Sequence, residues 1–223
     1  MDNVNHYKYA AGASALGAAA GAGYVASLWP KMTSWGARHD EVDETLPGDD
    51  LVGQARYRAT HAVTITSTPE QVWPWLVQMG QGRGGLYSYD WLENAVGLHM
   101  HSADRIVPSL QTLAVGDVIR MVPEGNEPSL RFAVAQIDAP HLLVLGPDTT
   151  RDEAFAKNMP YPCWTFRLSA DGPSCTRLVV RFQSDFEPSP MGLLMNKYAL
   201  QPVHFVMERK MMLGIKRRAE NAA

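Results

Sequence analysis

The chain has 223 residues, with 20 Lys and Arg against 23 Asp and Glu, a formal net charge of −3, and 46% hydrophobic residues. This length suits one domain, or one domain with a short extension. The composition excludes a disordered chain, a collagen-like repeat and a small disulfide-stabilised scaffold. The slightly acidic balance, without a basic block, argues against nucleic acid as a partner.

The first distinctive feature is an uncharged, Ala- and Gly-rich stretch over residues 9–30, between Lys8 and Lys31. About 20 mostly apolar residues are enough for a helix to cross a bilayer. We therefore expect an N-terminal tail over 1–8 and a single-pass transmembrane helix over 9–30. The few flanking charges leave the side of the membrane undecided.

Other interpretations of this stretch stay open. Ala18-x-Ala20 resembles a signal-peptidase site, so the segment could be a cleaved signal peptide, or it could be a soluble Ala-rich helix. Gly17 and Gly21 have the spacing that lets two membrane helices approach closely, which would suit contact with a membrane-protein partner.

An acidic segment follows, and we expect residues 31–56 to form a solvated linker. Residues 38–50 hold six carboxylates against one Arg, with a turn indicated at Pro47 and Gly48. Their spacing does not repeat that of a calcium-binding loop, so no metal site is predicted here.

From residue 57 to residue 220 the pattern predicts a globular domain. Alternation over 60–66 indicates a strand, and Ser67-Thr68-Pro69-Glu70 begins a short helix that runs to residue 79. A second short helix is predicted over 88–97. Five further strands are predicted over 117–122, 130–137, 141–145, 162–169 and 176–186.

The last predicted element is a long helix from residue 190 to about 219. Pro202 interrupts it and should kink it, because proline removes one backbone donor. The order of elements, with antiparallel strands between short helices and one long helix, predicts an α+β fold. In it a curved antiparallel sheet surrounds the long C-terminal helix.

With that order, the segment WPWLVQMGQGRGGLYSYDWLENAVGLHMHSADRIVP (73–108) resembles the SRPBCC superfamily, the START-like or helix-grip group of lipid-transfer proteins and polyketide cyclases. Residues 33–52 and 204–220 resemble an uncharacterised bacterial branch of it. The resemblance implies a seven-stranded sheet that grips the C-terminal helix and encloses an apolar cavity. Only six strands are evident, so the seventh is expected near Ile106–Leu113.

The glycine-rich stretch 80–85 lacks the signature of a phosphate-binding loop and follows a helix, not a strand. We expect it to form tight turns near the mouth of the implied cavity. Arg83, within this stretch, could bind an anionic group through its guanidinium or form a structural salt bridge.

A polar and aromatic cluster follows at Tyr87, Tyr89 and Asp90. These side chains could act as general acid and base inside a cavity, or could serve in helix capping and core packing. The remaining candidate ligand-binding residues are large or adaptable side chains that the resemblance would place around a cavity. They are Trp73, Trp164, Met195 and His204.

Metal and thiol chemistry find little support. His99, His101 and Asp104 lack a third strong ligand at a suitable spacing, so we expect structural or surface histidines and no metal. Cys163 and Cys175 flank a predicted hairpin, several residues out of register, so no disulfide is expected.

Together these features predict a membrane-tethered protein that binds a hydrophobic small molecule or lipid between sheet and C-terminal helix, without a cofactor. Two alternatives remain. One is an accessory subunit of a membrane complex, joined through the N-terminal helix. The other is a polyketide cyclase-like enzyme using Tyr87, Tyr89, Asp90 or His99.

Overall fold

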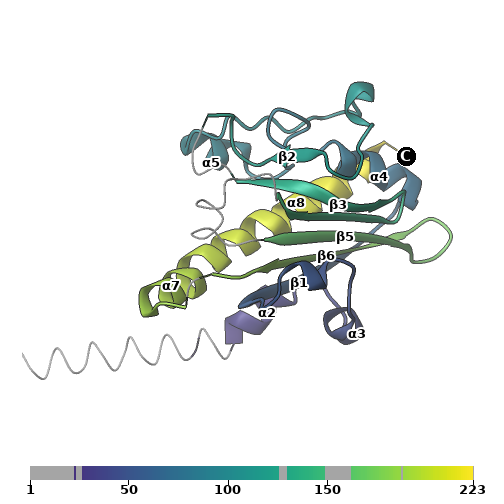
Figure 1. Ribbon diagram of the computed structural model, residues 1–223. Coiled ribbons are helices and arrows are strands. Elements are labelled where there is room, and N and C mark those ends of the chain that lie inside the picture. Colours follow the sequence, from purple (N-terminus) through teal and green to yellow (C-terminus); the bar gives the residue numbers. More distant parts are fainter. Residues whose placement is uncertain (1–22, 24–26, 126–129, 149–161, 187, 223) are drawn as a thin grey trace, which may run out of the picture.

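A computed structural model describes residues 23, 27–125, 130–148, 162–186 and 188–222. Its architecture is α+β. A six-stranded antiparallel sheet in the order β1-β6-β5-β4-β3-β2 packs against the long helix α8 (Gln201–Asn221) (Figure 1). This is the arrangement of a helix-grip fold, as predicted.

The strands lie within a few residues of their predicted positions. They are β1 (Tyr57–Ile65), β2 (Val118–Arg120), β3 (Arg131–Asp138), β4 (Leu142–Pro147), β5 (Cys163–Ala170) and β6 (Thr176–Ser184). The predicted seventh strand near Ile106–Leu113 is wrong: this stretch holds the 3-10 helix η3 (Pro108–Leu110). Pro108 lacks a backbone donor and favours the start of a helical turn over a sheet position.

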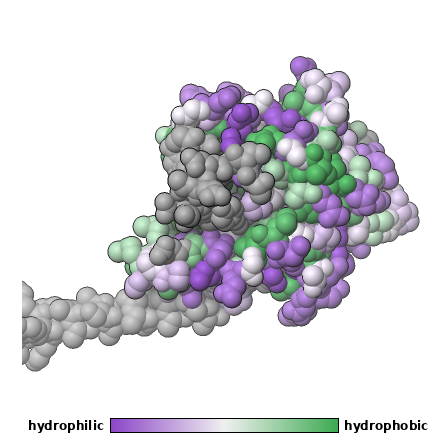
Figure 2. Space-filling model, viewed as in Figure 1, coloured by the Kyte–Doolittle hydropathy of each residue, from purple (hydrophilic) through white to green (hydrophobic). Residues whose placement is uncertain are grey.

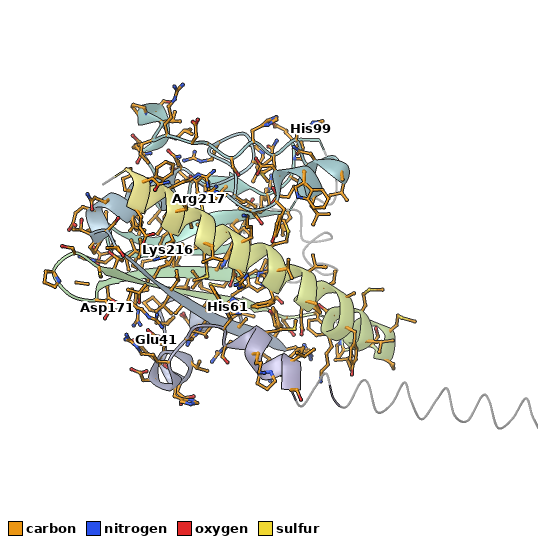
Figure 3. All side chains as sticks on the ribbon, turned by 180° about the vertical axis from the view of Figure 1, so that it is seen from behind. Glu41, His61, His99, Asp171, Lys216 and Arg217 are labelled. Carbon is orange, nitrogen blue, oxygen red and sulfur yellow. The ribbon has the colours of Figure 1, made fainter. Side chains whose placement is uncertain are left out.

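Alternation along the central strands separates two faces of the sheet. On β6, Leu178 and Val180 belong to the core under α8, whereas Arg177 and Arg181 point to the opposite face. On β1, His61 lies on the helix side (Figure 3). Successive side chains of a strand alternate between faces, so each residue's position in the pattern fixes its surroundings.

The C-terminal helical region comprises α7 (Pro190–Met195), a π-helical turn η4 (Asn196–Leu200) and α8 (Gln201–Asn221). The predicted interruption at Pro202 is this π-helical turn, with Pro202 in the first turn of α8. Widened turns commonly absorb such a break in the hydrogen-bond ladder. The buried stripe of α8 consists of Gln201, Glu208, Met211, Met212, Gly214, Ile215 and Ala219.

The segment after β1 forms the short helices α4 (Pro69–Val77) and α5 (Asp90–Ala95), as predicted. The connection between them lies directly on α8. A Cβ atom at Gly214 would sit 2.2 Å from the backbone oxygen of Tyr87, so only glycine permits this approach. The contact fixes residues 86–88 against the long helix.

The acidic segment packs onto the outer face of the sheet through α3 (His39–Asp43) and η2 (Asp49–Leu51), whereas α2 (Trp29–Thr33) lies against β1 and α8. Glu41 forms a two-pronged ion pair with Arg177, both at 2.7 Å. The prediction that this stretch is solvated is therefore wrong for Glu41. Burial opposes ionisation of Glu41, but Arg177 and Arg38 together outweigh it and lower the pKa of the carboxyl.

Two further expectations concern the cysteines and the N-terminal membrane helix. Cys163 and Cys175 are free thiols, and Cys163 lies opposite Gln183, which confirms that they form no disulfide. The predicted membrane helix over 9–30 falls almost entirely outside the described residues. Among the residues that are described, no helix is both long and apolar enough to span a membrane.

Candidate ligand-binding cavity

An apolar cavity of about 540 Å³ lies between α8, the sheet and the region around α5. This volume falls within the range of small-molecule sites. Most of its wall is aliphatic or aromatic, with contributions from Leu86, Leu92, Phe132, Trp164, Phe182 and Met211.

Ionisable side chains enter the cavity wall at Glu208, His204 and Glu93. Glu208 and His204 come from successive turns of α8, on the side that faces the sheet, and Glu93 comes from α5. Glu208 is only 2% exposed and Glu93 only 4%. Ionisable groups so deeply buried in an apolar wall are rare without a partner or a function.

Glu208 is held by a fully buried histidine. His61 Nδ1 contacts Glu208 Oε1, and His61 Nε2 lies 2.6 Å from the backbone oxygen of Met32. Both neighbours can only accept, so each nitrogen of His61 must carry a proton. Burial alone would lower the pKa of His61, but the Glu208 carboxylate outweighs it and raises the pKa. His61 and Glu208 therefore form a buried ion pair.

His204 differs from His61 in its charge state. Burial lowers the pKa of His204, and the Glu208 carboxylate, which favours protonation, only partly offsets this effect. The imidazole ring is therefore neutral at pH 7. Its Nε2 lies 3.3 Å from Glu208 Oε2, and its Nδ1 lies 3.5 Å from the hydroxyl of Tyr57. The Glu208 carboxylate favours a proton on Nε2 electrostatically, although this contact lacks the geometry of a hydrogen bond.

The second carboxyl of the cavity, Glu93, favours the protonated form. Burial, helped by the negative charge of Asp90, raises the pKa of Glu93 to about 7. Burial also raises the pKa of Glu208, but its two histidine neighbours reverse that effect and leave the pKa lowered. The cavity thus holds one ionised carboxylate and one carboxyl that is protonated below neutrality.

This contrast leads to a prediction for stability. Because the pKa of Glu93 is raised in the folded state, this group stabilises the fold fully at pH values below 4.5, the ordinary pKa of a glutamate. The stabilisation is lost as the pH rises through about 7, the pKa in the folded state. Glu93→Gln removes this titration, so the variant should exceed the natural protein in unfolding free energy by about 1–2 kcal/mol at pH 8. The advantage should shrink steadily towards pH 4.5.

Urea unfolding at a series of pH values measures this difference. Glu124→Gln, at a side chain that is 83% exposed, is the matched control. A stability difference between Glu93→Gln and the natural protein that does not change with pH would refute the assignment.

Of the sequence-predicted ligand residues, the structure places two on the cavity wall, Trp164 and His204. Trp73 is partly buried against the core, and Met195 lies exposed on α7. Arg83 has a structural role, but it donates hydrogen bonds to the backbone oxygens of residues 77, 79 and 110 and does not form the expected salt bridge.

Tyr87, Tyr89 and Asp90 lie together, but around a separate surface pocket of about 430 Å³. Both carboxylate oxygens of Asp90 accept hydrogen bonds from Ser102, at 2.6 and 2.7 Å. The Tyr87 hydroxyl donates to the backbone oxygen of Trp75 at 3.0 Å, and burial raises the pKa of Tyr87 to about 12. This cluster has the polar contacts of a structural support for the loop.

The histidine pair lies apart from both pockets. His99 and His101 are exposed in the loop after α5, and Figure 3 shows His99 well away from His61. Within the described part of the chain, no group of three or more His, Cys, Asp or Glu side chains is placed to hold a metal ion.

Sequence reasoning missed Glu208, His61 and Glu93. A signal for Glu208 existed, because it falls four residues after His204 and three before Met211, inside an apolar stripe at helical spacing. His61 falls at a core-facing position of the strand predicted over 60–66, where the alternating pattern does not distinguish it from its neighbours. Nothing local distinguished Glu93 from a solvated helix residue.

Comparison with known proteins adds structural likenesses. No family model and no curated protein matches the chain. A solved protein from Mesorhizobium loti is 15% identical, with coverage of 75% of this chain and 99% of that one and a TM-score of 0.45. A truncated norcoclaurine synthase from Thalictrum flavum is 12% identical, with coverage of 72% and 91% and a TM-score of 0.44.

A conserved protein from Geobacillus kaustophilus is 13% identical, with coverage of 74% and 97% and a TM-score of 0.44. At these identities and scores the likenesses carry no conclusion about activity. The fold stated above rests on the strand order and on the packing of α8 against the sheet.

Proposed function

We propose that this protein binds a hydrophobic small molecule or lipid in the cavity between the sheet and α8. The observation that carries the proposal is the cavity itself, about 540 Å³ with an almost entirely apolar wall. Protein interiors are otherwise close-packed, and a void of this size lowers stability unless something fills it. The SRPBCC resemblance supports the same proposal.

The first test fills the cavity with a side chain. Val203 and Val206 both lie on α8, 57% and 48% exposed, but only Val203 lines the cavity. Val203→Trp should weaken binding of the neutral fluorophore N-phenyl-1-naphthylamine at least about tenfold, because the indole occupies ligand volume. Val206→Trp should leave binding of the fluorophore unchanged.

Fluorescence titration of the full chain measures both affinities, and native mass spectrometry of the chain from its own host identifies what occupies the cavity. If both tryptophan variants weaken the probe equally, the probe binds elsewhere. In that case the proposed cavity function fails.

One observation favours an enzyme as a second candidate. Glu93 and Glu208 face the same cavity, and their surroundings push their pKa values in opposite directions. Such a pair can supply a general acid and a general base to one bound molecule. Tyr87, Tyr89, Asp90 and His99, the acid–base residues expected from the sequence, do not line this cavity.

We further propose that residues 9–30 attach this protein to a membrane. The support for this attachment is the uncharged sequence of that stretch and the apolar side chains exposed on α7, which include Met191, Leu194 and Met195. Figure 2 shows polar side chains over much of one face, with apolar patches between them. Exposed apolar patches of this kind commonly mark a lipid or protein contact. Flotation of the full chain with phospholipid vesicles tests the attachment.

A further inference from the structure

We infer that the end of the molecule formed by α7, η4 and the C-terminal end of α5 rests on the surface of a phospholipid bilayer, with the mouth of the cavity open towards the lipid. The inference rests on the proposed function and adds to it the route of the ligand, which passes between bilayer and cavity without crossing water. Attachment through residues 9–30 leaves the orientation of the domain undefined, whereas this contact assigns the face that meets the membrane.

The mouth of the cavity is marked by four side chains that line the cavity and are also exposed to solvent. They are Leu92 and Val96, at α5, and Leu200 and Val203, at the junction of η4 and α8. Their exposed fractions range from 38% to 72%. The opening therefore lies between α5 and the junction of η4 and α8, and its rim is apolar.

This rim continues into an exposed apolar surface on α7 and η4, which we call the apolar tip. Its large side chains are all exposed, and they are Met191, Leu193, Leu194, Met195 and Tyr198. Because α7, η4 and α8 follow one another as successive helical segments in contact, the tip and the rim form one apolar surface beside the mouth. Apolar patches of this kind commonly mark a contact with lipid or with another protein.

The charges of this surface fit a bilayer. From residue 188 to residue 207 the sequence contains no carboxylate, and its one Lys or Arg is Lys197. Anionic phospholipids attract basic side chains near the membrane surface and repel acidic ones. Tyr198 suits the membrane interface, because its ring is apolar and its hydroxyl is polar.

The uncharged N-terminal stretch ends beside the same surface. Trp29, near the end of residues 9–30, packs against Lys197 of η4, whose Nζ lies 4.9 Å from the centre of the indole ring. If residues 9–30 enter a bilayer, as proposed above, their position holds the tip close to the lipid. A second copy of the chain on this surface would close the mouth to the ligand, so we assign the surface to lipid.

The experiment places the polarity-sensitive fluorophore NBD at three positions of the full chain. Two variants, Leu194→Cys in the tip and Val96→Cys across the mouth, each carry Cys175→Ser as well, and both new cysteines replace exposed side chains. The natural protein labelled at Cys175 is the control, since Cys163 is buried and Cys175 lies in the hairpin between β5 and β6, at the end of the molecule away from α7 (Figure 1). Each labelled chain is mixed with vesicles of phosphatidylcholine and phosphatidylglycerol, with and without brominated acyl chains.

We expect the labels at 194 and 96 to shift their emission to shorter wavelength with vesicles and to lose most of it to the brominated chains. The physical reason is that an apolar surface docked on a bilayer reaches the boundary between head groups and acyl chains. The label at Cys175 should keep its emission. A response at neither or only one of the two positions, or an equal response at all three, would overturn the inference.

A shift without vesicles that grows with protein concentration would place a second copy on the tip, and it would overturn the inference as well. Binding of N-phenyl-1-naphthylamine to the unlabelled natural protein, measured without vesicles, tests the cavity function separately. If the fluorophore binds but the labels do not meet lipid, only the docking fails. If the labels meet lipid but the natural protein does not bind the fluorophore, the cavity function fails, and with it the proposed route of the ligand.

Discussion

Replacing Glu208 with Leu is expected to lower the unfolding free energy by about 3–5 kcal/mol, the usual effect of removing one partner from a buried ion pair. The variant leaves His61, which is fully buried, facing an apolar side chain at Nδ1. His61 must then lose its proton to stay folded. The deficit should therefore be larger at pH 5 than at pH 8, because acid favours the protonated histidine of the unfolded chain.

The double variant His61→Phe/Glu208→Leu provides the control. Each single change leaves one buried ionisable group without its partner, whereas the double change removes both, and an apolar replacement of a buried pair is often neutral. Urea unfolding of the natural protein, both singles and the double gives the coupling free energy. Single costs that simply add would contradict the ion pair.

The pair should also shape the pH dependence of the natural protein. The lowered pKa of Glu208 contributes stability above its ordinary 4.5, and this is lost as the pH falls through the folded pKa. The raised pKa of His61 contributes below its ordinary 6.5 and is lost as the pH rises through the folded pKa. The contribution of the pair is therefore fullest between pH 4.5 and 6.5.

Replacing Arg181 with Met should lower the unfolding free energy by a similar amount, about 3–5 kcal/mol. The affected region is the acidic segment on the outer face of the sheet. Arg181 has 0% exposure on the outer face of β6. It donates to Asp49 at 2.8 Å and to the backbone oxygens of Glu41, Val42 and Glu44 at 2.6–3.0 Å. Its removal leaves those acceptors buried without a donor and should release residues 38–51 from the sheet.

Urea unfolding measures the loss, and limited proteolysis should show new cleavage within 38–51 in Arg181→Met. Arg56→Met is the matched control, since Arg56 forms an ion pair with Asp185 that is about one-third exposed. Such a surface pair contributes less than about 1 kcal/mol. Equal stability losses in the two variants would show that Arg181 does not anchor the acidic segment.

The order of elements could be predicted because their patterns are local. The six strands and the helices α4, α5 and α8 lie close to their predicted positions, since side-chain period and turn residues depend on near neighbours in the chain. The expected seventh strand failed at Pro108, where the apolar residues nearby gave no information on sheet pairing. Of the candidate ligand residues, Trp164 and His204 reached the cavity.

The acidic segment shows why local composition can mislead. Glu41 and Asp49 resemble solvated linker residues in the sequence, and Arg177 and Arg181 resemble the polar half of an alternating strand. Their pairing joins positions more than 130 residues apart in the chain. The charge pattern of a short segment contains no information about an ion-pair partner so distant in the chain.

By itself, the sequence of this protein determined the α+β class, the strand order along the chain and the long C-terminal helix, because periodicity and turn chemistry are properties of short segments. Only the tertiary structure decided what His61, His204, Glu208 and Trp164 do. His204, Glu208 and Trp164, from α8 and β5, line one cavity, and His61 on β1 contacts Glu208, because the sheet packs on the helix. Their charge states depend on burial and on neighbours distant in sequence, which exist only once the chain has folded.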